Sequence, residues 1–169
     1  LANLLTAYGS NGITGLGNET ISVSDTGVGS SLDASDLNSL DSKTSGSVTT
    51  AAGLETLTGS VSALNTAYGS GGLTIDGDEA ITITGSAVTV AAADLNLLNS
   101  YTSGSINADN VAKLTGSVAD LNTAFGAKAA SGSNGINFGG SAGAADQAVE
   151  ITDATVLAVD LNTLNGNTT

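Results

Sequence analysis

Two stretches of the chain carry nearly the same residues 57 positions apart. Residues 57–69 read LTGSVSALNTAYG, and residues 114–126 read LTGSVADLNTAFG. The first ten residues, LANLLTAYGS, repeat the later part of this pattern. Self-similarity at a fixed period is typical of repeat architectures, in which each unit packs against the next. We therefore expect a repeat array instead of one irregular domain.

A second pattern alternates with the first. It reads SDLNSLDSKTSGSV at residues 35–48, ADLNLLNSYTSGSI at 93–106 and VDLNTLNGNTT at 159–169. Each long repeat thus contains two related halves, which divides the chain into units 1–60, 61–117 and 118–169. The third unit holds a stretch rich in Gly, Ala and Ser at 127–147, which predicts a surface loop. Because the pattern starts and stops within a repeat, we expect residues 1–169 to be one array and a fragment of a longer one.

Each half-repeat has helical spacing around one shared leucine. The six shared leucines are Leu4, Leu37, Leu64, Leu95, Leu121 and Leu161. Val61, Leu64 and Tyr68 follow the i, i+3, i+7 spacing of a helix with one apolar face. The sequence therefore predicts a short helix in every half-repeat.

The ends of two helices can be predicted from their flanking residues. Ser60 and Ser117 stand at N-cap positions, and Gly69 and Gly126 stand where a left-handed C-cap belongs. Runs rich in β-branched residues between the helices predict strands at 19–24, 46–48, 79–84, 104–106 and 149–153.

A short strand joined to a short helix buries little surface unless its neighbours cover it. We therefore expect an α/β or mainly β fold, a right-handed parallel solenoid built from coils of one short strand plus one short helix. In this fold Leu4, Leu64 and Leu121 would form one inward stack, and the other three shared leucines a second.

Composition excludes several classes of function. The chain has three Lys and Arg residues against sixteen Asp and Glu, for a net charge of -13, and it has no Cys, His, Met, Trp or Pro. Nucleic acids and anionic membranes require clustered cations, so we expect neither as a partner. No apolar run approaches the length of a membrane span, so we expect no membrane insertion.

One string has the form of a catalytic motif. GGSAG at 139–143 fits the G-x-S-x-G pattern of a nucleophile elbow. Activation of Ser141 would require a general base, yet the chain has no His. We expect no enzymatic activity and no required cofactor.

The strongest candidate for a bound ion is the acidic segment GGLTIDGDEAITI at 71–83. Asp76, Asp78 and Glu79 follow one another on a glycine turn, and oxygen ligands of this kind suit Ca²⁺. The spacing differs from the calcium turns of secreted β-rolls, and a solvated acidic turn is the simpler interpretation. We expect all three side chains on an exposed turn, with any cation bound there.

Two further polar patterns recur. An asparagine follows the shared leucine at Asn38, Asn65, Asn96, Asn122 and Asn162. In solenoids such residues form hydrogen bonds with the backbone of the neighbouring coil, so a structural role is expected. Threonines alternate within residues 80–90, which fits either a strand with one wet face or a row facing ice or polysaccharide.

The strings LNTAYGS, GLGNETISVSD, LTGSVADLNTAFG and VDLNTLNGNTT resemble the repeats of giant secreted surface proteins of marine cyanobacteria, of the type required for swimming without flagella. The resemblance implies an extracellular or cell-surface location and a structural, adhesive or motility-related role.

Two functions remain in competition. One is a structural segment of a fibre, filament or surface layer, whose partners are further repeats or other copies of itself. The alternative is a solenoid binding module, such as a phage fibre segment or a carbohydrate- or ice-binding domain, with an outward ladder of Thr, Asn or aromatic residues.

Overall fold

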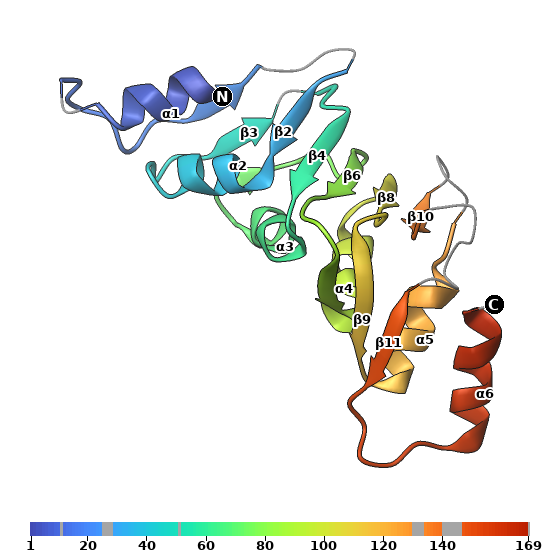
Figure 1. Ribbon diagram of the computed structural model, residues 1–169. Coiled ribbons are helices and arrows are strands. Elements are labelled where there is room, and N and C mark those ends of the chain that lie inside the picture. Colours follow the sequence, from blue (N-terminus) through green and yellow to red (C-terminus); the bar gives the residue numbers. More distant parts are fainter. Residues whose placement is uncertain (11, 25–28, 51, 130–133, 140–146, 169) are drawn as a thin grey trace.

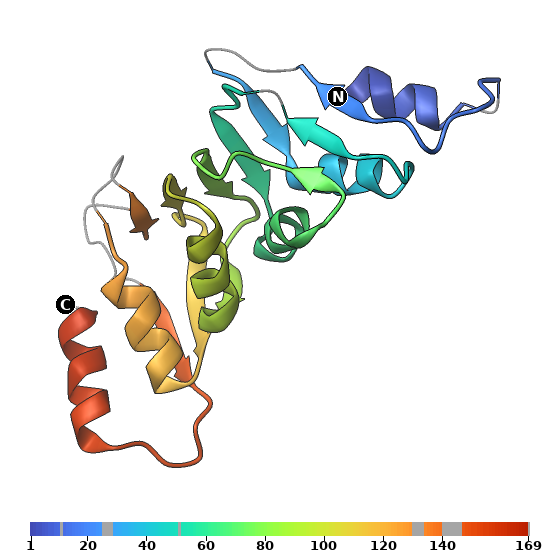
Figure 2. The same cartoon turned by 180° about the vertical axis from the view of Figure 1, so that it is seen from behind.

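The computed structural model describes residues 1–10, 12–24, 29–50, 52–129, 134–139 and 147–168. Within these residues the fold is α/β, with six helices and three sheets whose strands are all parallel. The elements follow one another in chain order, with α1 at one end of the molecule and α6 at the other (Figures 1 and 2). None of the described helices combines the length and the hydropathy needed to cross a membrane.

Each half-repeat contains one helix, as expected. The helices are α1 (Ala2–Tyr8), α2 (Ala34–Asp41), α3 (Val61–Gly69), α4 (Ala92–Tyr101), α5 (Val118–Gly126) and α6 (Ala158–Asn167). The two predicted N-caps are confirmed, because Ser60 accepts a hydrogen bond from the Ala63 amide and Ser117 from the Asp120 amide.

The left-handed C-caps predicted at Gly69 and Gly126 are wrong. Both glycines lie inside their helices, and neither has a positive φ. Ser70 and Ala127 are the C-cap residues, with φ of -73° and -84°. A glycine near a helix end permits the left-handed conformation, but the path of the following chain decides whether it is used.

All five predicted strand regions overlap a strand, although 46–48 shares only Val48 with its strand, and the structure adds six more strands. The strands are β1 (Ile21–Val23), β2 (Ser31–Asp33), β3 (Val48–Thr50), β4 (Thr56–Gly59), β5 (Leu73–Thr74), β6 (Ala80–Ile83), β7 (Val88–Ala91), β8 (Ser105–Asn107), β9 (Val111–Gly116), β10 (Gly135–Asn137) and β11 (Ala148–Ile151). The expected coil of one strand and one helix is therefore too simple, because most helices are followed by two strands.

The sheets follow one order of pairing. The central sheet has the order β2-β4-β6-β8-β10, and the outer sheets have the orders β1-β3-β5 and β7-β9-β11. Strands that are equivalent in sequence occupy equivalent places in the sheets. The order β7-β9-β11 corresponds to β2-β4-β6 of the central sheet, and the order β1-β3-β5 corresponds to β6-β8-β10. A strand with a given local sequence therefore pairs with the equivalent neighbouring strand in each sheet that contains both strands.

Paired strands come from consecutive half-repeats. Leu57 pairs with Leu32, 25 residues before it, and with Ile81, 24 residues after it. Leu114 and Val149, in the lengthened third unit, pair across 35 residues. Each passage of the chain through a helix therefore returns it to the next place along the sheet.

The core contains an inward row of aliphatic side chains from the central sheet, facing the helices. Its members are Leu32, Leu57, Ile81, Ile106 and Ile136, all buried and in register across the five strands. This burial supplies the hydrophobic stabilisation that short helices and strands lack by themselves.

The shared leucines form one row, which corrects the expectation of two stacks. Each helix lies against the next in chain order (Figure 1). Leucines of the two half-repeats therefore alternate along the row. Leu37, Leu64, Leu95 and Leu121 are fully buried. Leu4 is half-buried and Leu161 is exposed, because α1 and α6 each have one helical neighbour among the described residues.

Part of the stretch 127–147 lies in the core, although it was expected to be a surface loop. β10 falls within it and pairs with β8. Ile136 and Phe138 are buried, and the Phe138 ring lies 5.2 Å from that of Phe125. A period-2 pattern in INF was hidden by the surrounding glycines and alanines. Ser141 lies outside the described residues.

Candidate functional surfaces

The acidic turn differs from expectation at one residue. Asp76 and Asp78 are exposed, whereas Glu79 is 1% exposed. One oxygen of Glu79, Oε2, accepts hydrogen bonds from the Tyr68 hydroxyl and the Gly77 amide, each at 3.0 Å. The Asp76 amide donates to Oε1 at 3.1 Å. The prediction that Glu79 lies on an exposed turn is therefore wrong, since these donors compensate for the burial of its carboxylate.

These bonds account for both oxygens of Glu79. No group of three acidic side chains among the described residues is arranged to hold a metal ion. Calcium at this turn stays a prediction, and Asp76 and Asp78 are the carboxylates left exposed to meet it.

The same tyrosine–glutamate contact occurs one repeat earlier. Tyr8 donates to Oε2 of Glu19 at 3.0 Å, and the Gly17 amide donates to the same oxygen at 2.7 Å. The Gly17 amide bond is the main cause that lowers the pKa of Glu19. Burial, followed by the charge of Glu79, raises the pKa of Tyr68. In both repeats the spacing from tyrosine to glutamate is 11 residues. This regular spacing in the sequence could have predicted the contact.

The main-chain oxygen of each glutamate also accepts a hydrogen bond from the following half-repeat. The Thr44 hydroxyl donates to the main-chain oxygen of Glu19 at 2.8 Å, and the Thr102 hydroxyl donates to that of Glu79 at 3.0 Å. In the third repeat Phe125 replaces the tyrosine. Its ring packs against that of Phe138, 5.2 Å away, so an apolar contact stands where the tyrosine hydroxyl would make a polar one.

The recurrent asparagines form a ladder between helices, as predicted. Their side-chain amides donate to a main-chain oxygen of the next helix: Asn38 to Ala63, Asn65 to Asp94, Asn96 to Asp120 and Asn122 to Asp160, at 2.9 to 3.2 Å. Each acceptor immediately precedes the shared leucine of its helix. The ladder therefore sets the position of each helix along the next.

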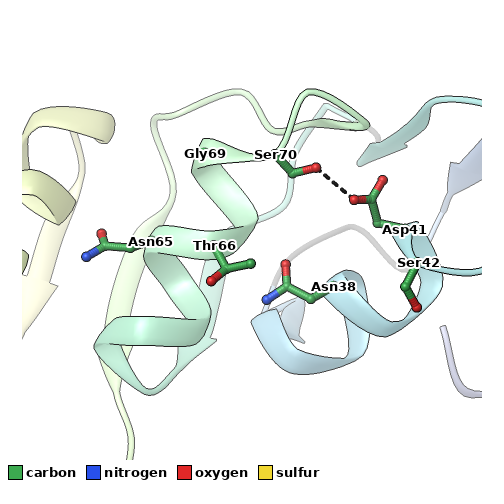
Figure 3. Close-up of a pocket in the computed structure, with 7 residues that line it drawn as sticks. All are labelled: Asn38, Asp41, Ser42, Asn65, Thr66, Gly69 and Ser70. Carbon is green, nitrogen blue, oxygen red and sulfur yellow. Dashed lines mark hydrogen bonds between the residues drawn. The ribbon is translucent and has the colours of Figure 1, made fainter.

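An open groove of about 560 Å³ lies between α2 and α3 (Figure 3). Its polar groups largely bind one another or nearby backbone. Ser70 donates to Asp41 at 2.7 Å, and Thr66 donates to the Ser62 carbonyl at 2.8 Å. Asn38 belongs to the ladder. The groove thus resembles a seam between packed helices more than a preformed ligand site.

A row of polar side chains crosses the outer face of the central sheet. Its members are Asp33, Thr58, Thr82, Asn107 and Asn137, in register over five parallel strands. Several are engaged locally, since Asn107 accepts from the Asp109 amide and Asn137 from the Gly139 amide. The Thr82 hydroxyl makes no hydrogen bond within the described residues. The repeat spacing of about 4.8 Å could match a periodic polar ligand.

The chemistry of these surfaces is that of packing and hydrogen bonding. The tyrosine–glutamate contact and the threonine bond to the glutamate carbonyl each occur in two of the three long repeats. The asparagine ladder recurs between successive helices from α2 to α6. Comparison with protein-family models, curated proteins and solved structures found no match to this chain.

Proposed function

We propose that the chain is a structural segment of an extended right-handed parallel solenoid. The observation that carries this proposal is the asparagine ladder, which joins five successive helices by four equivalent bonds. The strands of the central sheet pair in the same order, because each strand pairs with the equivalent strand of the next half-repeat. Right-handed crossover between parallel strands is the strong general preference.

The assembly would be an extracellular or cell-surface fibre, filament or surface layer with an adhesive or motility-related role. The resemblance to giant surface repeats of marine cyanobacteria supports this location. A net charge of -13 keeps copies apart at low ionic strength and disfavours nucleic acid. In this proposal the chain is not an enzyme, and its partners are further repeats or copies of itself.

Light scattering across a salt series tests the proposal, together with negative-stain imaging. The Debye length falls from about 10 Å at 0.1 M to about 3 Å at 1 M salt, so association should strengthen as salt rises. Threads or ordered layers are the expected images. A compact monodisperse particle at every salt concentration would contradict the structural role.

A binding module is the second candidate, and the polar row on the central sheet favours it. The row presents Thr82 between Thr58 and Asn107, which suits a polysaccharide or an ice surface. Thr82→Lys would place a long charged side chain in the middle of the row. Glycan binding or thermal hysteresis that this variant abolishes would support the binding module, and their absence in the unaltered protein would exclude these two ligands.

A further inference from the structure

The outer sheet β7-β9-β11 stops where the central sheet continues. In the central sheet β8 pairs with the edge of β6 that faces away from β4, placing Ile106 beside Ile81. β11 is the equivalent of β6, since Val149 pairs with Leu114 as Ile81 pairs with Leu57. No described strand pairs with the corresponding edge of β11. Unpaired edges of this kind are templates for strand addition.

Side-chain burial changes at the same place. Ile81 and Ile83 of β6 are each 1% exposed, whereas their counterparts Val149 and Ile151 are half-buried. These two side chains line an open groove of about 280 Å³ together with Leu161 and Leu164 of α6. The groove is therefore an uncovered part of the aliphatic core.

The residues before α6 show a second uncovered position. Val156 stands two residues before α6, as Leu32 and Val90 stand two residues before α2 and α4. Leu32 and Val90 lie in strands paired with β4 and β9 and are 4% and 7% exposed. Val156 lies in no strand and is 37% exposed. The segment 154–157 thus corresponds in sequence to a strand, but it pairs with no strand among the described residues.

The helix itself provides a third sign. Leu161 of α6 is 46% exposed, whereas Leu95, at the same position in α4, is fully buried. The Asn96 side chain donates to the next helix, but Asn162 is exposed and its side chain has no hydrogen-bond partner in the described part of the chain. Strand edge, strand segment and helix face therefore all lack the same neighbour.

We propose that this α6–β11 face, comprising β11, residues 154–157, Leu161 and Asn162, is a docking interface for a further coil of the same repeat. The occupant has the pattern of residues 102–126, which follow α4 in the chain and form β8, β9 and α5. This inference rests on the proposed structural role. It is supported by continuity with the interfaces between the coils already present.

The occupant can be placed by equivalence. Its first strand pairs in parallel with β11, with its Ile106 position beside Val149. Its second strand pairs with residues 154–157, as β9 pairs with β7. Its helix covers Leu161 and accepts the Asn162 amide at the Asp120 position. One such repeat segment thereby covers the edge of β11, Val156 and Leu161, and it provides an acceptor for the side-chain amide of Asn162.

The test uses a synthetic peptide that copies residues 102–126, titrated into the full chain by isothermal calorimetry. We expect one peptide to bind per chain. Leu161→Asp should weaken binding at least about tenfold, because a carboxylate would replace a leucine that the bound peptide would bury. Leu97→Asp is the matched control, since Leu97 is 44% exposed on α4, away from this face. It should leave the affinity unchanged. Circular dichroism checks that both variants fold.

A second peptide carrying Ile106→Asp should bind at least about tenfold more weakly than the first. Failure of the unaltered peptide to bind the folded chain at millimolar concentration would overturn the proposal. Equal weakening by Leu161→Asp and Leu97→Asp would overturn it too. If the peptide does not bind but the chain self-associates, and Leu161→Asp abolishes that self-association, the face would be assigned to a second copy instead. Because the peptide assay needs no fibre, the docking interface and the larger structural role can fail separately.

Discussion

The side-chain amide of Asn96 donates a hydrogen bond to the main-chain oxygen of Asp120, 3.0 Å away in the next helix. The accepting carbonyl lies in the first turn of α5, so the bond connects two half-repeats. Its equivalents in three other helix pairs make it a property of the repeat. Packing between successive half-repeats is therefore held by directional contacts as well as by the aliphatic core.

Asn96→Ala should lower the free energy of unfolding by about 0.5–1.5 kcal/mol, because it removes one such hydrogen bond. The measurement is urea unfolding followed by circular dichroism. Asn162→Ala is the control, since Asn162 occupies the same helical position but donates to no described residue. Equal effects of the two substitutions would show that helix propensity, and not the ladder, governs the change.

Leu95→Ala should cost about 2–5 kcal/mol, the range for truncating a buried leucine. Leu95 is fully buried, and Leu97, two residues later on α4, is 44% exposed. Leu97→Ala should therefore change stability by less than about 0.5 kcal/mol. A loss for Leu95→Ala no greater than that for Leu97→Ala would contradict the inward row of leucines. Thermal melts of both variants provide the comparison.

Gly104→Ala should destabilise the protein strongly, because an added Cβ would overlap the main-chain oxygen of Glu79. The close approach accompanies the bond from Thr102 to that oxygen. Backbone must move to make room, so we expect a loss of several kcal/mol, on the scale of severe overpacking. Gly126→Ala meets no atom within 4 Å and should be neutral or slightly stabilising. Urea unfolding of the pair distinguishes the two.

Tyr68 should make stability fall in alkali. Its pKa is raised in the folded protein by burial and by Glu79, whereas in the unfolded chain it ionises near pH 10. Below pH 10 the tyrosine is protonated in both states, so its full contribution to the free energy of unfolding is present. As pH rises above 10 the unfolded chain loses the proton first, and stability declines.

Tyr68→Phe removes this ionisation and should flatten the decline by the equivalent of about one proton. At neutral pH the variant should lose about 1–3 kcal/mol, because Glu79 stays buried with one donor fewer. Unfolding measured from pH 7 to 11 tests both effects. A slope above pH 10 identical to that of the unaltered protein would show that Tyr68 ionises equally in both states.

Much of the helical framework could be predicted from the sequence. Helix positions follow from local information, namely the i, i+3, i+7 spacing around the shared leucine and the serine caps at Ser60 and Ser117. The asparagine ladder was also predictable, because the same residue recurred beside the shared leucine. The spacing of Tyr68 and Glu79 was equally regular, but an acidic turn gave no local sign that its glutamate would be buried.

Strands were harder to predict than helices. β4 and β9 end in Gly59 and Gly116, residues that signal turns in a sequence. β10 is three residues long and lies among glycines and alanines. Such strands exist because neighbouring coils supply their hydrogen bonds, and that pairing depends on residues 24 to 35 positions away.

The sequence by itself determined the period, the helix in every half-repeat and the residues that join one helix to the next. These follow from contacts between residues close in the chain and from the recurrence of one pattern. Only the tertiary structure decided that the leucines form one row, that Glu79 is buried beneath Tyr68, and that Leu161 is exposed while Leu95 is covered. The physical reason is that a neighbouring half-repeat provides the burial. The local sequences around Leu95 and Leu161 are similar, but α4 packs against both α3 and α5, whereas α6 packs against α5 alone among the described helices.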